Sequence, residues 1–377
     1  MAARSWKSRR PKSSLPTRSP STPSSFCRRS CRAGVVASIR TVLGDVTPDA
    51  VGPVMFHEHV LFDIVPPGLD GDRDGPIGIE DRWQMDYRSN ESARNALQTD
   101  RAVAASELAA YAADGGSLIV DQSVFGLARD MAGLAEASRV SGVHVVAAAG
   151  TYVDAYMTPE IRTMPVALLA DRFASEVLDG ADGTGLRAGL IGEIGCSWPL
   201  LPSETRALEA SADAQRRTGA AISVHPGRHP DACGQILDIL AANGADLSRV
   251  VLCHMDRTHP DGAGIEPLLQ RGANVEWDFF GIEQSHYWMT DDVELPTDLG
   301  RLRLIRDFAA RGFADRILVS HDICTKTRLR RWGGHGYGHI LRNVRALMQR
   351  LDFGADLIGA LLRDTPVRLL TLKETAP

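Results

Sequence analysis

Six side chains that could bind a metal recur along the chain, each inside or directly after a short apolar run. His57 and His59 stand one residue apart in VMFHEHVLFD (54–63). The other four are Glu193 in LIGEIG, His225 in ISVHPG, His254 in VVLCHMD and Asp322 in ILVSHD. A buried imidazole or carboxylate is costly unless it is hydrogen-bonded, paired or bound to metal. Any one of them alone could be a satisfied core residue, or a helix N-cap for Asp322, but their repetition favours one shared centre.

Two divalent ions fit this set better than one. Residues i and i+2 of a strand face the same side, so His57 and His59 point together. The first ion is expected to bind His57, His59, Glu193 and Asp322. The second is expected to bind Glu193, His225 and His254, with one position left for water. Glu193 would bridge them, and this mixture of imidazole and carboxylate suits Zn²⁺, with Mn²⁺, Co²⁺ or Fe²⁺ as alternatives.

The elements that carry these residues alternate between two patterns. Eight β-branched runs are expected to be strands: 51–60, 116–124, 143–153, 186–195, 220–227, 249–256, 273–281 and 316–324. Amphipathic runs between them, such as 100–116, 201–219 and 296–315, are expected to be helices. Eight βα units predict an α/β fold, a (β/α)8 TIM barrel, with the doubly wound open sheet as the alternative. Residues 39–46 predict a hairpin arm at the barrel floor, and the long connections 61–98 and 282–300 predict pocket walls.

Composition narrows the class of protein. The net charge of −5 gives no basic surface for nucleic acid, and no apolar run is long enough to span a membrane. Six scattered cysteines suit reduced thiols in the cytoplasm rather than a disulfide framework. Residues 1–38 are expected to be a disordered basic tail, because residues 1–33 hold nine Lys or Arg and no acid. A transit-like segment and an upstream translation start are the other readings. Residues 39–377 would form the barrel.

Longer motifs around the candidate ligands resemble a known family. They are HEH (57–59), IGEIGCSWPL (191–200), HPGR (225–228), HMDRT (254–258), HDICTKTRL (321–329) and GGHGYGHIL (333–341). In this order they resemble the phosphotriesterase-like branch of the amidohydrolase superfamily, and within it the phosphotriesterase-related proteins. The resemblance spans residues 39–377. It implies a barrel with a two-metal centre and a bridging hydroxide.

One departure from that family bears on activity. Founding members of the branch bridge their metals with a carboxylated lysine on the fourth strand, where this chain has Glu193 instead. The phosphotriester hydrolysis of those founding members is therefore not directly expected of this chain. The expected chemistry is hydrolysis by a hydroxide formed from bridging water, with Asp322 as catalytic residue accepting the proton and passing it to the leaving group.

The substrate is expected to be small and anionic. Arg228, Lys326 or Arg328 could bind a carboxylate or sulfonate at the mouth of the pocket, and a solvated basic face is the simpler alternative. Tyr152 could hydrogen-bond the substrate or simply pack. An N-acyl amino acid or similar amide, a carboxylic ester or a lactone fits such a clamp. The alternatives are a phosphotriesterase, a metal-dependent enzyme that is not a hydrolase, and a metal-bound binding protein without catalysis. The sequence leaves open whether two copies form a homodimer.

Overall fold

Eight parallel strands form the centre of the fold. The computed structural model describes residues 37–69 and 71–373, so the predicted tail lies outside it apart from residues 37 and 38. The strands are β3 (Val54–Glu58), β6 (Leu118–Asp121), β7 (His144–Ala149), β8 (Leu190–Gly195), β9 (Ile222–His225), β10 (Val250–Leu252), β11 (Asn274–Trp277) and β12 (Ile317–Val319). They pair in chain order, each parallel to the next.

The sheet closes between its first and last strands. The backbone N–H of Asp322 donates to the carbonyl of His57 at 3.1 Å. Glu58 Oε1 accepts from Ser320 Oγ at 2.9 Å and from the backbone N–H of His321 at 3.0 Å, while its Oε2 accepts from Ile323 N–H at 3.0 Å. These bonds join β3 to the segment after β12. The (β/α)8 barrel is therefore confirmed, and the open sheet is wrong.

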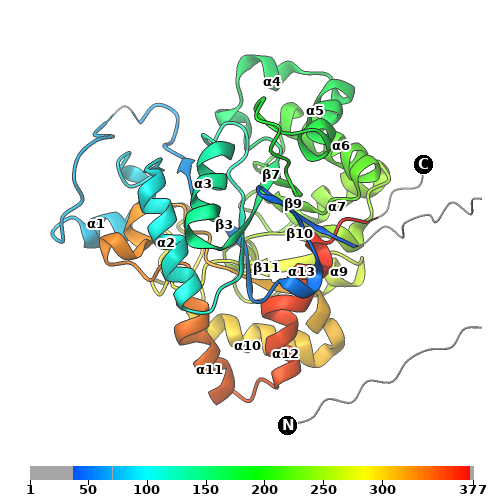
Figure 1. Ribbon diagram of the computed structural model, residues 1–377. Helices are drawn as coiled ribbons and strands as arrows, with labels where there is room; N and C mark the ends of the chain where they lie inside the picture. The colour runs from blue at the N-terminus through cyan, green and yellow to red at the C-terminus, as the bar shows by residue number, and fades with distance from the viewer. Residues whose placement is uncertain (1–36, 70, 374–377) are drawn as a thin grey trace, which may run out of the picture. The chain divides into compact units, whose positions relative to one another are not determined.

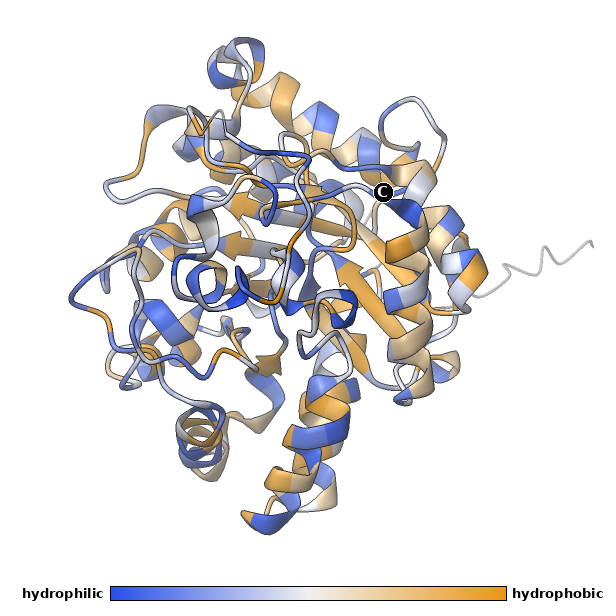
Figure 2. Ribbon diagram, turned by 90° about the vertical axis from the view of Figure 1, so that its left-hand side faces the viewer, coloured by the Kyte–Doolittle hydropathy of each residue, from blue (hydrophilic) through white to orange (hydrophobic). Residues whose placement is uncertain are grey.

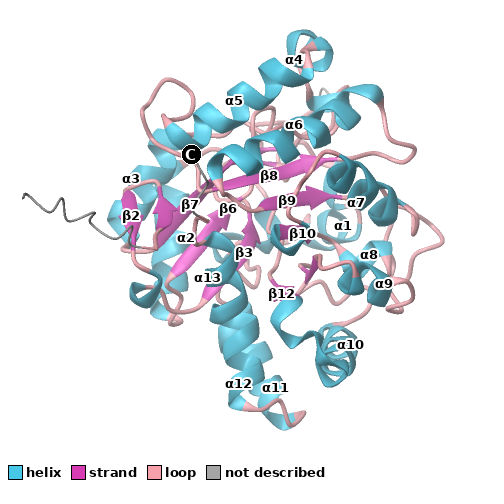
Figure 3. Cartoon of the chain, turned by 90° about the vertical axis from the view of Figure 1, so that its right-hand side faces the viewer, coloured by secondary structure: helices cyan, strands magenta, loops and turns pink. Residues whose placement is uncertain are grey.

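Helices surround the barrel and fill the βα connections (Figures 1 and 3). The longer ones are α2 (Arg101–Ala113), α3 (Met131–Ser141), α5 (Val166–Leu178), α6 (Pro202–Thr218), α7 (Ala232–Ala242) and α10 (Asp298–Phe308). The shorter ones are α4 (Pro159–Thr163), α8 (Met255–Thr258), α9 (Ile265–Gln270), α11 (Arg345–Arg350), α12 (Ala355–Gly359) and α13 (Thr365–Leu370). Local signals set their ends: Asp100 caps α2 by accepting from two backbone N–H groups, and Gly219, at φ 70°, ends α6.

Apolar side chains pack on both sides of the strands, which are orange in Figure 2. One cluster, which includes Val54, Phe56 and Leu318, fills the lower barrel interior, and a larger one lies between strands and helices. The predicted arm is the antiparallel hairpin β1 (Ile39–Thr41) and β2 (Gly44–Val46), whose Ile39 joins the interior cluster. Because Val42 N–H donates to Val145 O near the start of β7, the hairpin covers the floor.

The two long connections carry structure of their own. Residues 61–98 contain β4 (Phe62–Asp63), α1 (Arg82–Tyr87) and β5 (Leu97–Gln98). Tyr87 of α1 stacks on His286 of the 282–300 connection, with ring centroids 5.2 Å apart. The two connections therefore touch above the barrel, as expected for pocket walls. In the described residues, no helix is long and apolar enough to cross a membrane.

Candidate metal centre

The fold brings all six predicted ligands together at the carboxyl ends of the strands. Glu193 of β8 lies in the middle. Its Oε1 is 2.7 Å from His225 Nδ1 and 2.8 Å from His254 Nε2. These three residues form one compact cluster, Glu193, His225 and His254, in which every side chain is buried. It is the set predicted for the second ion.

The remaining ligands form the other half of the centre. His57 Nε2 is 3.6 Å from Glu193 Oε1, and His59 Nε2 is 4.0 Å from Glu193 Oε2. Asp322 Oδ1 lies 3.3 Å from His59 Nε2 and 3.8 Å from His57 Nε2. Glu193 reaches both halves, as the prediction requires of a bridge. A third cluster, of His57, His254 and Asp322, overlaps the two.

The donor set fits divalent cations. Ligands about 2.1 Å from a tetrahedral ion lie about 3.4 Å from one another, close to the separations here. His57 is fully buried, yet neither ring nitrogen has a hydrogen-bond partner. His254 Nδ1 is 2.9 Å from Asp278 Oδ1, so its proton belongs there and Nε2 turns a lone pair to Glu193. Two facing acceptors at 2.8 Å repel each other unless a metal ion or a proton is shared between them.

Both candidate carboxylates have a lowered pKa, which favours the anionic form that a metal ligand needs. Burial alone would raise the pKa of Glu193, but the surrounding imidazoles, His225 first, hold it well below its usual value. Burial likewise opposes ionisation of Asp322, but a hydrogen bond from His59 outweighs it and brings the pKa of Asp322 to about 2. Burial and the charge of Arg257 lower the pKa of His254, so a proton at its Nε2 is disfavoured.

Backbone geometry helps to aim two ligands. His254 has φ 58° and Asp322 has φ 48°, in the left-handed region that side chains other than glycine rarely adopt. Each residue follows the last residue of its strand closely and turns the chain towards the next segment. Such conformations cost roughly 1–3 kcal/mol each and concentrate at functional sites.

The sequence analysis missed the residues that hold the ligands in place. Asp278, just after β11, accepts the backbone N–H of His254 at 3.0 Å and lies 3.3 Å from His57 Nδ1 through the same oxygen. Ser123 Oγ is 3.1 Å from His59 Nδ1. The signal for Asp278 was present, because NVEWD places an acid at the end of a strand like the other ligands.

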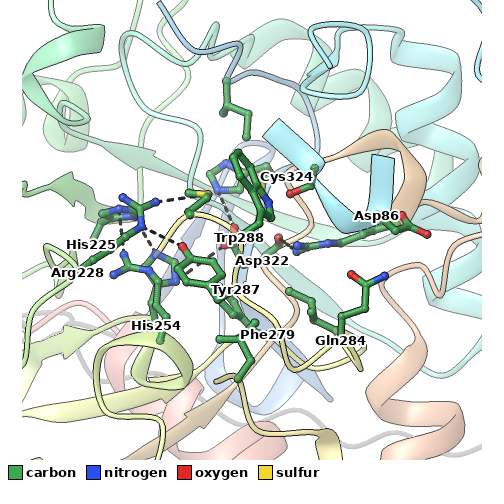
Figure 4. Close-up of a pocket in the computed structure, with 18 of the residues that line it drawn as sticks. Asp86, His225, Arg228, His254, Phe279, Gln284, Tyr287, Trp288, Asp322 and Cys324 are labelled. Atoms are coloured by element: carbon green, nitrogen blue, oxygen red, sulfur yellow. Dashed lines mark hydrogen bonds and ion pairs between the residues drawn. The ribbon is translucent and has the colours of Figure 1, made fainter. Parts of the chain in front are cut away.

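The cluster opens into a pocket whose walls come from the long connections (Figure 4). The pocket is partly open to solvent and has a volume of about 90 Å³. Tyr152, Arg228 and Arg328 line it, and Tyr152 OH is 3.4 Å from His225 Nδ1. Lys326 is not among the lining residues, and its Nζ lies 5.6 Å from the ring centroid of Trp332. The structure thus does not bring Lys326 into the pocket.

Known proteins share both sequence and fold with this chain. The model of the Phosphotriesterase family matches residues 37–370. This chain belongs to the phosphotriesterase family. It is 39% identical to human N-acetyltaurine hydrolase, covering 89% of this chain and 98% of that protein. The salmon protein of the same name, from Salmo salar, is 38% identical with the same coverage.

Solved structures share the fold of this chain. A resiniferatoxin-binding protein from Rhodobacter sphaeroides is 34% identical with a TM-score of 0.83, over 89% of this chain and 95% of that chain. The phosphotriesterase homology protein from Escherichia coli, solved with phosphate in its active site, is 25% identical with a TM-score of 0.71, over 86% of this chain and 100% of that chain. The chain is therefore a hydrolase of the phosphotriesterase-related type, from a family that uses a binuclear metal centre.

Proposed function

We propose that this hydrolase cleaves the amide bond of a small anionic N-acyl substrate, of which N-acetyltaurine is the first candidate. The observation that carries the proposal is the pairing of the ligand cluster with the cationic wall beside it. Arg228 makes no ion pair with any described residue, and its Nε donates to Tyr287 OH at 3.0 Å. A guanidinium held in this way is ready for a sulfonate or carboxylate. The curated relatives act, by name, on an N-acyl sulfonate.

We assign the ligands as the sequence predicted: His57, His59, Glu193 and Asp322 for one ion, and Glu193, His225 and His254 for the other, with Zn²⁺ the first choice. Bound there, the ions supply a coordinated water of near-neutral pKa and polarise the scissile carbonyl. Asp322, buried and ionised, would accept the proton of the attacking water and return it to the leaving amine. Tyr152 would orient the substrate beside His225.

Arg228 would hold the anionic end of the substrate, and Arg328 would add positive charge at the edge of the pocket. Arg328 NH1 donates to the backbone carbonyl of Asp322 at 2.9 Å, which fixes this guanidinium at the edge of the pocket. A neutral phosphotriester would gain nothing from either charge, so amides and esters of acids rank above it. We also propose a cytoplasmic location, because the described cysteines, Cys196, Cys233, Cys253 and Cys324, are all free thiols.

Steady-state kinetics on the zinc- and manganese-loaded protein test this function. The panel is N-acetyltaurine, N-acetyl amino acids, a lactone, an aryl ester and a phosphotriester. We expect N-acetyltaurine or an N-acetyl amino acid to give the highest kcat/KM. Arg228→Gln should raise KM for these anions about tenfold or more, while Lys326→Gln, the control outside the pocket, should leave KM unchanged. A phosphotriester hydrolysed faster than every amide would refute the proposal.

A further inference from the structure

A second arginine in the same pocket is buried but makes no ion pair with a described residue. Arg257 lies on α8, three residues after His254, and is only 2% exposed. It lines the pocket beside His225 and Tyr287. It makes no ion pair with any carboxylate among residues 37–69 and 71–373. Fully buried arginines are rare unless they are paired.

The hydrogen bonds of Arg257 leave its charge and part of its donor capacity unused. Its NH2 donates to Pro226 O at 2.9 Å and lies 3.1 Å from His225 Nε2, and its NH1 is 3.3 Å from Thr258 Oγ1. A guanidinium has five N–H donors, so two of them find no acceptor in the described part of the chain. Burial lowers the pKa of Arg257, and the nearby charge of Arg228 adds to this effect.

The other buried arginines show what a purely structural role looks like here. Arg301, 0% exposed, donates to the carboxylates of Asp256 and Asp298. Arg249, 8% exposed, donates to the carbonyls of Arg368, Leu369 and Thr371 near the barrel floor. Arg301 is neutralised within the protein, while Arg249 gives its hydrogen bonds to backbone carbonyls and leaves its Nε without a partner. Arg257 is the one of the three that faces the pocket, where a ligand can reach its unused donors.

We propose that Arg257 and Arg228 together form the binding site for the anionic group of the substrate, a sulfonate or carboxylate. Arg257 is the inner arm, fixed beside His225, and Arg228 is the outer arm, fixed by Tyr287. An oxyanion between them accepts the unused N–H donors and offsets two positive charges that otherwise repel each other. This inference rests on the proposed function for the identity of the substrate. The site itself is specific for small anions.

Direct binding measures this site without turnover. The zinc-loaded full-length protein is titrated calorimetrically with ethanesulfonate, with propionate and with the neutral isostere ethyl methyl sulfone. We expect Arg257→Gln to weaken binding of both anions at least tenfold and to leave the sulfone unchanged. Arg228→Gln should act in the same direction. In the double variant the two losses should fall short of additivity, because both arms bind one ion.

A matched control separates anion binding from a structural role. Arg249→Gln also removes a buried guanidinium, but it strips donors from backbone carbonyls, so it should lower Tm while ethanesulfonate binds as in the wild type. Arg257→Gln should lower Tm less than Arg249→Gln, because it removes the donor of one backbone carbonyl, Pro226 O, rather than of three. Because Arg257 also contacts His225, elemental analysis must show that the variant binds zinc before its anion binding is compared. If Arg257→Gln fails to fold, Arg257→Lys is the second variant. It keeps the positive charge but loses the planar set of guanidinium donors, so it should bind anions several-fold more weakly than the wild type.

Unchanged anion binding in the folded Arg257 variant, or no anion binding by the wild type, overturns the inference. The hydrolysis assay keeps the two proposals distinct. Anion binding that depends on Arg257 in a protein that cleaves no amide would contradict the proposed function alone. Amide hydrolysis with anion binding independent of Arg257 would contradict this inference alone.

Discussion

Asp278 offers the sharpest test of the metal centre, because one carboxylate supports two ligands. Its Oδ1 accepts from His254 Nδ1 at 2.9 Å, and its Oδ2 accepts the backbone N–H of His254 at 3.0 Å and lies 3.3 Å from His57 Nδ1. In Asp278→Asn only one of these positions keeps an oxygen. Whichever way the amide turns, its NH2 group faces an N–H donor.

The size of the effect follows from that mismatch. A buried donor left without its acceptor costs about 1–3 kcal/mol. At about 1.4 kcal/mol per tenfold change, zinc affinity should fall roughly tenfold to a hundredfold. Competition with a fluorescent zinc chelator measures the Kd, and elemental analysis gives the metal content. Asp307→Asn is the matched control, since Asp307 pairs with Arg311 on the exposed surface. Equal zinc affinity in Asp278→Asn and the wild type would mean that this carboxylate does not orient the ligands.

Further predictions concern turnover and stability. Asp322→Asn should abolish hydrolysis while most of the metal remains bound, and full activity in that variant would exclude Asp322 as proton acceptor. Burial alone would raise the pKa of Asp298, but its hydrogen bond with His339 outweighs burial and brings the pKa to about 2. Its ionisation therefore stabilises the fold above about pH 4. Asp298→Asn should lose about 2 kcal/mol in urea unfolding at pH 7, and its deficit should shrink as pH falls towards 2; a pH-independent deficit would contradict this. Leu208 is fully buried on α6, so Leu208→Ala should lower the free energy of unfolding by about 2–5 kcal/mol in the same assay. Leu201 is exposed, so Leu201→Ala should lower it by less than about 0.5 kcal/mol.

The convergence of the candidate ligands was predictable because the same chemistry recurs at the ends of several strands. One buried acid has many explanations, but Glu193, His225, His254 and Asp322 occur at the same place in four strands. In a parallel barrel those places meet. The eight strands and the floor hairpin followed from periodicity in the same way.

Local irregularities were not predictable. The register of β3 against β6 shifts between Met55 and Glu58, and that of β8 against β9 shifts between Ile191 and Ile194. As a result Phe56 lies in the interior cluster while its neighbour His57 also reaches the centre. Strict alternation would have put these two side chains on opposite faces. A bulge that re-aims a side chain depends on pairing between distant strands, which a single sequence does not reveal.

Partners supplied by distant segments were equally hidden. Lys326 and Arg328 look alike in TKTRLRR, yet Arg328 reaches the pocket and Lys326 lies near Trp332. Arg257 carries no signal of its own within HMDRT. The unpaired charge of Arg257 becomes visible only when every carboxylate around it has been placed.

The carboxylate of Glu58 has a consequence for biosynthesis. It fastens the first barrel strand to Ser320, His321 and Ile323, near the end of the chain. At ribosomal speed those partners emerge roughly a quarter of a minute to a minute after Glu58 does. Throughout that interval Glu58 lacks these partners and the barrel cannot close, so recruitment of chaperones to the nascent chain should peak before residue 323 clears the exit tunnel.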